Sequence, residues 1–198
     1  MAHTETAPSG SSSATQAHPD KLSAQSIRVL TVLLIGAFVV ILNETALNVA
    51  LSRIMVDLSI DERTAQWLTT GFMLTMAIVI PITGWIMERL PTRAVFTLAM
   101  SLFSVGTLMA ALGWGFPSLL AGRLVQASGT AIMMPLLMTT VMELVPPGAR
   151  GRVMGTISLV ISAAPAIGPT VSGLILQFLP WRFVFVLVGR VVVGRVRL

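Results

Sequence analysis

Cysteine is absent from the 198-residue sequence, and histidine occurs only twice, as His3 and His18. The lack of cysteine excludes disulfides, thiolate metal sites and cysteine nucleophiles. Because both histidines lie near the N-terminus, histidine-based catalysis and metal binding are excluded from the rest of the chain. No nucleophile–base pair and no set of metal ligands is visible elsewhere, so we expect neither enzyme activity nor a cofactor.

Charged residues are also scarce, at 11% of the chain, whereas hydrophobic residues make up 55% and the mean hydropathy is +0.87. A soluble domain carries about a quarter charged residues, so this composition indicates a membrane protein. The net charge of +5 comes from basic residues that fall at intervals between apolar runs. That distribution suits membrane topology and argues against a nucleic-acid partner.

The apolar runs divide the chain into a tail and a membrane domain. Residues 1–26 are rich in Ser, Ala, Thr and Pro, which predicts a disordered tail rather than a signal peptide. Residues 27–198 are expected to form a transmembrane domain, since each crossing needs about 20 apolar residues. The prediction is an all-α membrane protein with five firm spans and a weaker sixth, which contains Arg190: 29–51, 66–87, 94–113, 118–145, 153–179 and 183–198.

Basic residues are shared unevenly between the two sets of loops. The tail and the loops after the second and fourth spans contain Lys21, Arg28, Arg89, Arg93, Arg150 and Arg152, whereas the opposite loops contain Arg53, Arg63 and Arg182. Because positively charged loops tend to stay in the cytoplasm, we expect a multi-pass protein of the cell membrane, embedded in the lipid bilayer, with a cytoplasmic N-terminus. The outer interface would then hold Trp67, Trp114 and Trp181.

Two charged residues lie well inside the predicted spans, Glu44 in the first and Arg123 in the fourth. Counted at about 1.5 Å per residue, both lie about 10 Å below the outer boundary of the membrane. Because an isolated charge in lipid is costly, we expect them to share a polar interior and to compensate each other. Such residues usually mark a transport or proton pathway; the alternative is a purely structural pair.

The chemistry of the two groups differs. Glu44 can bind or release a proton, because burial favours a neutral carboxyl group and a neighbouring arginine favours the carboxylate. Proton binding and binding of a cationic substrate would then compete. Arg123 keeps its charge and serves as a fixed counter-charge. Asn48 and Gln126, each one turn further along, are candidates for the same cavity or, equally, for hydrogen bonds between helices.

Four segments occur in a fixed order along the chain: LNETALNVAL (42–51), GWIMERLPTR (84–93), GRLVQASGTA (122–131) and APAIGPTVSG (164–173). They resemble the first-helix, cytoplasmic-loop, fourth-helix and fifth-helix motifs of drug:proton antiporters in the major facilitator superfamily, fourteen-span branch. WRFVF (181–185) is similar to the start of the sixth helix. The resemblance covers residues 28–185.

Several positions depart from these motifs. Asn43 stands where the first-helix motif commonly has aspartate, so the acid is shifted by one residue to Glu44. In the loop motif, Glu88 replaces aspartate, and Pro91 and Thr92 replace a glycine and a basic residue. In the fifth-helix motif two glycines are replaced by other small residues, Ala164 and Ser172. Small residues still permit close helix packing.

The resemblance implies roles for two further groups of residues. A cytoplasmic gate held by charge contacts would include Gly84, Glu88, Arg89, Arg93 and Glu143. The alternative is simple positive-inside anchoring, which we favour for Arg150 and Arg152. The fifth-helix motif would pack against the other half of a transporter, or form an ordinary kinked helix, through Pro165, Gly168, Pro169 and Gly173.

The resemblance further implies export of small hydrophobic or cationic compounds, driven by a proton gradient and without a cofactor. The chain would be the N-terminal six-helix half, with two inverted three-helix repeats. The alternatives are a non-transporting fragment and an uptake carrier for a nutrient. Because the motifs stop at Phe185, we expect a missing C-terminal half and no export by this chain alone.

Overall fold

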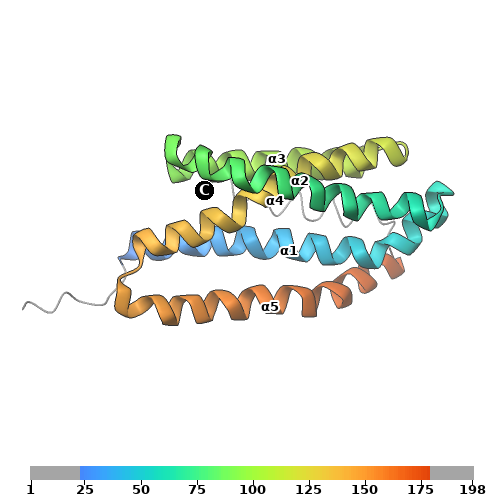
Figure 1. Cartoon of the computed structure of the whole chain (residues 1–198). Helices are drawn as coiled ribbons and strands as arrows, with labels where there is room; N and C mark the ends of the chain where they lie inside the picture. Colours follow the sequence, from blue (N-terminus) through green and yellow to red (C-terminus); the bar gives the residue numbers. More distant parts are fainter. Residues whose placement is uncertain (1–22, 179–198) are drawn as a thin grey trace, which may run out of the picture.

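A computed structural model describes residues 23–178, which form five α-helices joined by short loops (Figure 1). Each helix is long and apolar enough to cross a membrane, and no strand occurs among these residues. The predicted all-α membrane fold is thus confirmed for five helices. The weak sixth span and residues 1–22 of the tail lie outside the described residues. The helices are α1 (Ala24–Leu58), α2 (Glu62–Arg89), α3 (Thr92–Leu112), α4 (Phe116–Leu144) and α5 (Pro147–Phe178).

All five helices begin before the predicted spans, and at α1 and α2 a capping side chain, not the start of the apolar run, marks the first turn. α1 begins at Ala24, inside the predicted tail, since the Ser23 hydroxyl oxygen accepts a hydrogen bond from the Ser26 N–H. α1 ends at Leu58, and the next residue, Ser59, takes a left-handed conformation with φ of 51°. Asp61 caps α2 by accepting from the Thr64 N–H, and hydrogen bonding to Thr64 lowers the pKa of Asp61.

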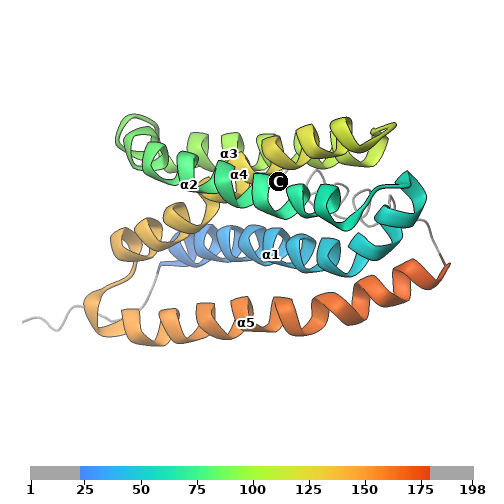
Figure 2. The same ribbon diagram turned by 45° about the vertical axis from the view of Figure 1, so that its right-hand side comes forward.

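α4 is the central helix of the bundle. In its most apolar stretch 61% of the residues are buried, against 17% in α2 and 22% in α5. α4 packs against α3, α2 and α1, whereas α5 packs mainly against α1. Both views show α1 between α5 on one side and the group of α2, α3 and α4 on the other (Figures 1 and 2).

Glycines bring the backbones of α3 and α4 into contact. A Cβ atom added to Gly122 of α4 would lie 2.7 Å from the backbone nitrogen of Ala110 and 2.8 Å from the carbonyl oxygen of Gly106, both on α3. No real side chain fits at such distances, so the close approach requires glycine. It sets the position of the neighbouring residue on α4, Arg123.

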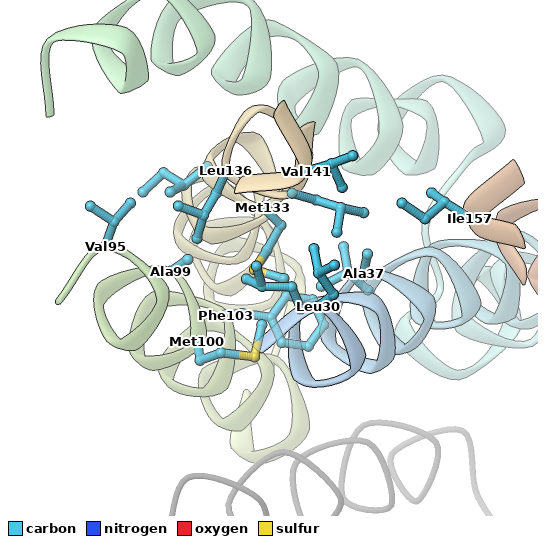
Figure 3. Close-up of a cluster of buried hydrophobic side chains, with 14 of the residues drawn as sticks. Leu30, Ala37, Val95, Ala99, Met100, Phe103, Met133, Leu136, Val141 and Ile157 are labelled. Atoms are coloured by element: carbon cyan, nitrogen blue, oxygen red, sulfur yellow. The ribbon is translucent and has the colours of Figure 1, made fainter. Parts of the chain in front are cut away.

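Two apolar clusters fill the bundle at different depths. The larger one joins α1, α3 and α4, and Ile157 reaches it from α5 (Figure 3). The smaller one lies further along α1, at Ala46–Ile54, and also includes residues of α2, α3 and α4. On α1, α3 and α4 alike, the residues between the two clusters include polar ones: Asn43, Glu44, Thr107, Arg123 and Gln126. A polar layer therefore separates two apolar ones.

Candidate functional site

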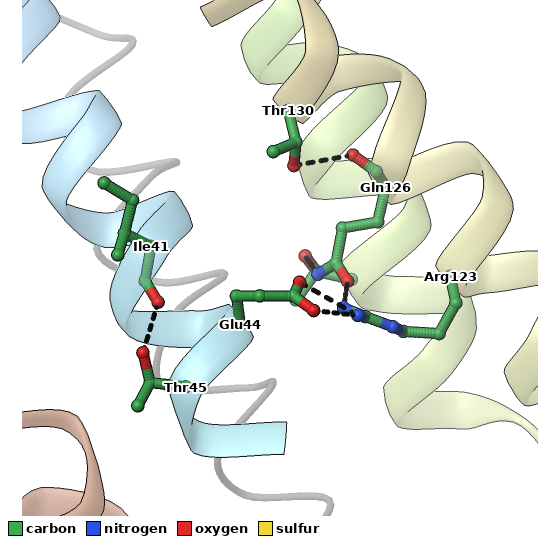
Figure 4. A network of polar contacts seen from close by, with 7 residues as sticks. Ile41, Glu44, Thr45, Arg123, Gln126 and Thr130 are labelled. Carbon is green, nitrogen blue, oxygen red and sulfur yellow. Dashed lines mark hydrogen bonds and ion pairs between the residues drawn. The ribbon is translucent and has the colours of Figure 1, made fainter. Parts of the chain in front are cut away.

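Glu44 and Arg123 form an ion pair in the polar layer (Figure 4). The Nη2 atom of Arg123 lies 2.9 Å from each carboxylate oxygen of Glu44. The pairing expected from the sequence is confirmed. The Arg123 side chain is fully buried, whereas 28% of the Glu44 side chain is exposed. The arginine is therefore enclosed by protein, and the carboxylate is open on one side.

Arg123 contacts two further groups besides Glu44. Its Nη1 atom donates to the Oε1 atom of Gln126, one turn along α4. Its guanidinium carbon lies 4.1 Å from the ring centroid of Phe72 on α2, a cation–π distance. A buried charge needs such compensation, because removing it from water is costly. α1, α2 and α4 all contribute to holding this one side chain.

Gln126 extends the hydrogen-bond network to α3. Its Nε2 atom donates to the hydroxyl oxygen of Thr107 at 2.8 Å, and that hydroxyl donates to the carbonyl oxygen of Phe103 at 2.6 Å. Gln126 thus makes the hydrogen bond between helices that was one of the two expectations for it, and its role in a cavity stays a prediction. Thr107 and Phe72 were not predicted. A threonine or phenylalanine in an apolar span is ordinary, so the sequence has no signal that marks either one.

The two asparagines of α1 do not join this network. Asn48, predicted for the same cavity, is exposed and makes no side-chain hydrogen bond within the described residues. Asn43 is only 1% exposed, yet its side-chain amide atoms have no partner among those residues. Glu44, and not the residue at the family's usual acid position, is the one that contacts Arg123.

The predicted gate residues lie at the end of the bundle where α2 meets α3 and α4 meets α5. All five are exposed, and across residues 23–178 none of the expected ion pairs of Glu88 and Glu143 forms. Glu143 does line a shallow pocket beside Leu90 and Thr92 of the loop motif. Charged groups in water need no partner, which explains the absent pairs. Arg89 stacks on Trp85 at 4.2 Å. Among the described residues, a Cβ atom added to Gly84 meets nothing within 4 Å, and Arg93 has no ion pair.

Arg150 at the same end has a structural role that the sequence did not predict. Its Nε atom donates to the carbonyl oxygen of Val145 at 3.0 Å, and its Nη2 atom donates to that of Met142 at 2.8 Å. These carbonyls lie at the C-terminal end of α4, where helix carbonyls lack partners within the helix. Arg150 therefore caps α4.

The fifth-helix motif is divided between two faces of α5. Gly168 is buried against α1, where an added Cβ atom would lie 2.8 Å from the Cβ atom of Thr45. Pro165 and Pro169 are exposed, and nothing lies within 4 Å of a Cβ atom added to Gly173. Gly168 thus contacts α1 within this chain, and the expected packing of the motif against another half stays a prediction. Figure 4 shows Thr45 and Glu44 pointing to different sides of α1, so α5 packs directly behind Glu44.

Comparisons with known proteins agree with the membrane fold. The family model of the Major Facilitator Superfamily matches residues 33–193. Over 160 residues the chain is 48% identical to the uncharacterized MFS-type transporter YcnB of Bacillus subtilis, covering 81% of this chain and 34% of YcnB. It is 44% identical over 166 residues to the lincomycin resistance protein LmrB of Bacillus subtilis, covering 82% of this chain and 35% of LmrB.

A solved structure has the same fold. It is the inward-facing, unoccupied crystal structure of a bacterial homolog to the human lysosomal transporter Spinster, with a TM-score of 0.68 and 22% sequence identity. The structural match covers 85% of this chain and 41% of the Spinster homolog's chain. The chain thus spans about a third of the length of the curated relatives it matches.

Proposed function

The chain belongs to the Major Facilitator Superfamily, and on that premise we propose that it supplies the N-terminal part of a proton-coupled exporter of hydrophobic or cationic compounds. The name of one relative, a lincomycin resistance protein, supports drug export over nutrient uptake. The proposal places the N-terminus and the loops after α2 and α4 in the cytoplasm, following the bias of basic residues.

The observation that carries the proposal is the unequal exposure of the ion pair. Arg123 is fully enclosed and Glu44 is partly open, so a proton or a cation can approach the carboxylate without displacing the guanidinium. Ionisable residues at membrane depth usually serve ion or proton pathways. No other acid lies in the polar layer of the described helices, so Glu44 is the group that would exchange the proton.

The proposed cycle depends on competition at Glu44. A proton that binds the carboxylate neutralises it, which weakens its contact with Arg123 and removes its attraction for a cation. When the proton leaves, the carboxylate can accept a lipophilic cation from the open side. Arg123 remains charged throughout, and its partners on α2 and α4 hold it in place.

Proton release on cation binding tests this proposal. The chain is purified, reconstituted into liposomes and titrated with tetraphenylphosphonium, while a pH-sensitive dye reports protons. We expect the wild-type chain to release protons on binding and Glu44→Gln to release none. Glu62→Gln, an exposed acid at the start of α2, is the matched control and should behave as the wild type. Equal proton release from Glu44→Gln and wild type would contradict the proposal.

The cytoplasmic placement has its own test. Reporter fusions at Asp61 and at Gly148 should give signals from opposite sides of the membrane, with Gly148 inside. An external signal at Gly148 would overturn the orientation. The gate at Glu88 and Glu143 remains a proposal for other conformations, because the two acids have no ion pair in the part of the chain that the structure describes.

A further inference from the structure

The ion pair has an unusual geometry. Both carboxylate oxygens of Glu44 accept from the same nitrogen of Arg123, Nη2. The Nε atom of Arg123 is buried and has no acceptor among the described residues. Arginine and carboxylate groups frequently pair instead through two parallel N–H···O bonds from two nitrogens, which is a stronger arrangement. If the guanidinium turned so that Nε also faced Glu44, Nε would gain an acceptor. Other contacts of Arg123 must therefore prevent this rotation.

The constraint comes from the opposite end of the guanidinium. Nη1 donates to Gln126, and the amide of Gln126 donates in turn to Thr107. The Thr107 hydroxyl gives its only proton to the carbonyl oxygen of Phe103. Its oxygen can therefore only accept from Gln126. The amide of Gln126 must present its NH2 group to Thr107 and its oxygen to Arg123.

Phe72 restrains the same group from its face. The ring of Phe72 lies 4.1 Å from the guanidinium carbon and is almost fully buried, at 3% exposure. Because the ring and the Gln126 oxygen act on different parts of the guanidinium, they set both its tilt and its rotation. Residues of α2, α3 and α4 thus determine which nitrogen faces Glu44.

We propose that Thr107 is a positioning residue that orients the Gln126 amide and thereby holds Arg123 with a single nitrogen toward Glu44. The consequence rests on the proposed function: a carboxylate held by one nitrogen leaves its partner for a cation more readily than one held by two. Thr107 lies on α3 and has no hydrogen bond to Glu44 or Arg123, so it acts only through Gln126.

The first test observes the guanidinium itself. The chain is labelled with ¹⁵N-arginine in lipid nanodiscs, and the Nε–H resonance of Arg123 is assigned by its loss in Arg123→Lys. Thr107→Val keeps the shape of the side chain and removes the acceptor. We expect its Nε–H resonance to move downfield and to exchange more slowly with water, as the nitrogen gains Glu44 as acceptor. Thr107→Ser keeps the hydroxyl and should retain the wild-type resonance.

A second variant breaks the same chain of bonds at another helix. Gln126→Met removes both hydrogen bonds while retaining side-chain length, and it should shift the Nε–H resonance as Thr107→Val does. An unchanged resonance in both variants would overturn the proposal. An equal shift in Thr107→Ser would overturn it too, because packing and not the hydroxyl would then be the cause.

The second test measures the consequence for ligand binding. In Thr107→Val the Kd for tetraphenylphosphonium should rise about tenfold, the effect of one charge-assisted hydrogen bond, and Thr107→Ser should bind as the wild type. A Kd that is unchanged despite the shifted resonance would refute the link to binding. If the wild-type chain binds no cation at all, the proposed function fails, whereas the resonance still decides the role of Thr107.

Discussion

The centre of the bundle and the end formed by the α2–α3 and α4–α5 connections contain the same charged residue types in opposite environments. At the centre, Glu44 and Arg123 are paired, and the arginine also contacts Gln126 and Phe72. At the loop end, Glu88, Arg93 and Glu143 are exposed and make no ion pair within residues 23–178; that end also includes Arg89, Arg150 and Arg152.

Water accounts for the difference. An exposed ion pair contributes about 0–1 kcal/mol, since solvent already stabilises each charge. A buried charge has lost that solvation and is stable only with partners. Similar membrane depth and opposite sign are therefore enough to predict pairing at the centre of the bundle, and they are not enough at its end.

The largest expected effect comes from removing the partner of the buried arginine. Glu44→Ala leaves Arg123 without its counter-charge and should destabilise the fold by about 3 kcal/mol. Unfolding in mixed micelles with a rising fraction of dodecyl sulfate measures it. The double variant Glu44→Ala/Arg123→Ala should be more stable than the sum of the single effects predicts, by about 1–3 kcal/mol. Strict additivity would show that the two charges are not coupled.

A glycine comparison tests packing in the same two regions. Gly122→Ala places a Cβ atom against the backbone of α3 at the centre and should cost about 1–3 kcal/mol. Gly84→Ala, in open space near the loop end, should be neutral or stabilising by up to about 1 kcal/mol. The same unfolding assay applies. Equal effects of the two variants would mean that α3 and α4 do not approach as closely as described.

Arg150 is the loop-end residue for which we expect a measurable contribution. Arg150→Ala removes two hydrogen bonds to carbonyls of α4 and should cost about 1 kcal/mol. Arg152→Ala, at a neighbouring exposed arginine whose side chain makes no hydrogen bond within residues 23–178, should change stability by less than about 0.5 kcal/mol. A similar loss for both variants would point to general charge effects and not to capping.

The smallest effects should come from the acids of the loop end. Glu88→Gln and Glu143→Gln should each alter unfolding stability by less than about 0.5 kcal/mol, because neither carboxylate has an ion pair among the described residues. A loss as large as that of Glu44→Ala would show that these acids pair with arginines in the membrane. The contrast between the two regions would then disappear.

The sequence by itself was sufficient for the number of described helices, their membrane class and the pairing of Glu44 with Arg123. Apolar length and the cost of a buried charge are properties of a residue in lipid, so they can be evaluated before any neighbour is known. The helix ends were less accurate, as at Ala24, because a capping hydroxyl and not hydropathy determines where a helix starts.

Only the tertiary structure decided which uncharged residues complete the site. Thr107, Phe72 and Gly168 belong to three helices, and each could face a partner, the interior or lipid as far as sequence patterns are concerned. The close contact of α3 with α4 at Gly122 brings Thr107 to Gln126, and the packing of α5 on α1 brings Gly168 to Thr45. Hydrogen bonds and van der Waals contacts act over a few ångströms, so their partners are determined by which helix faces meet.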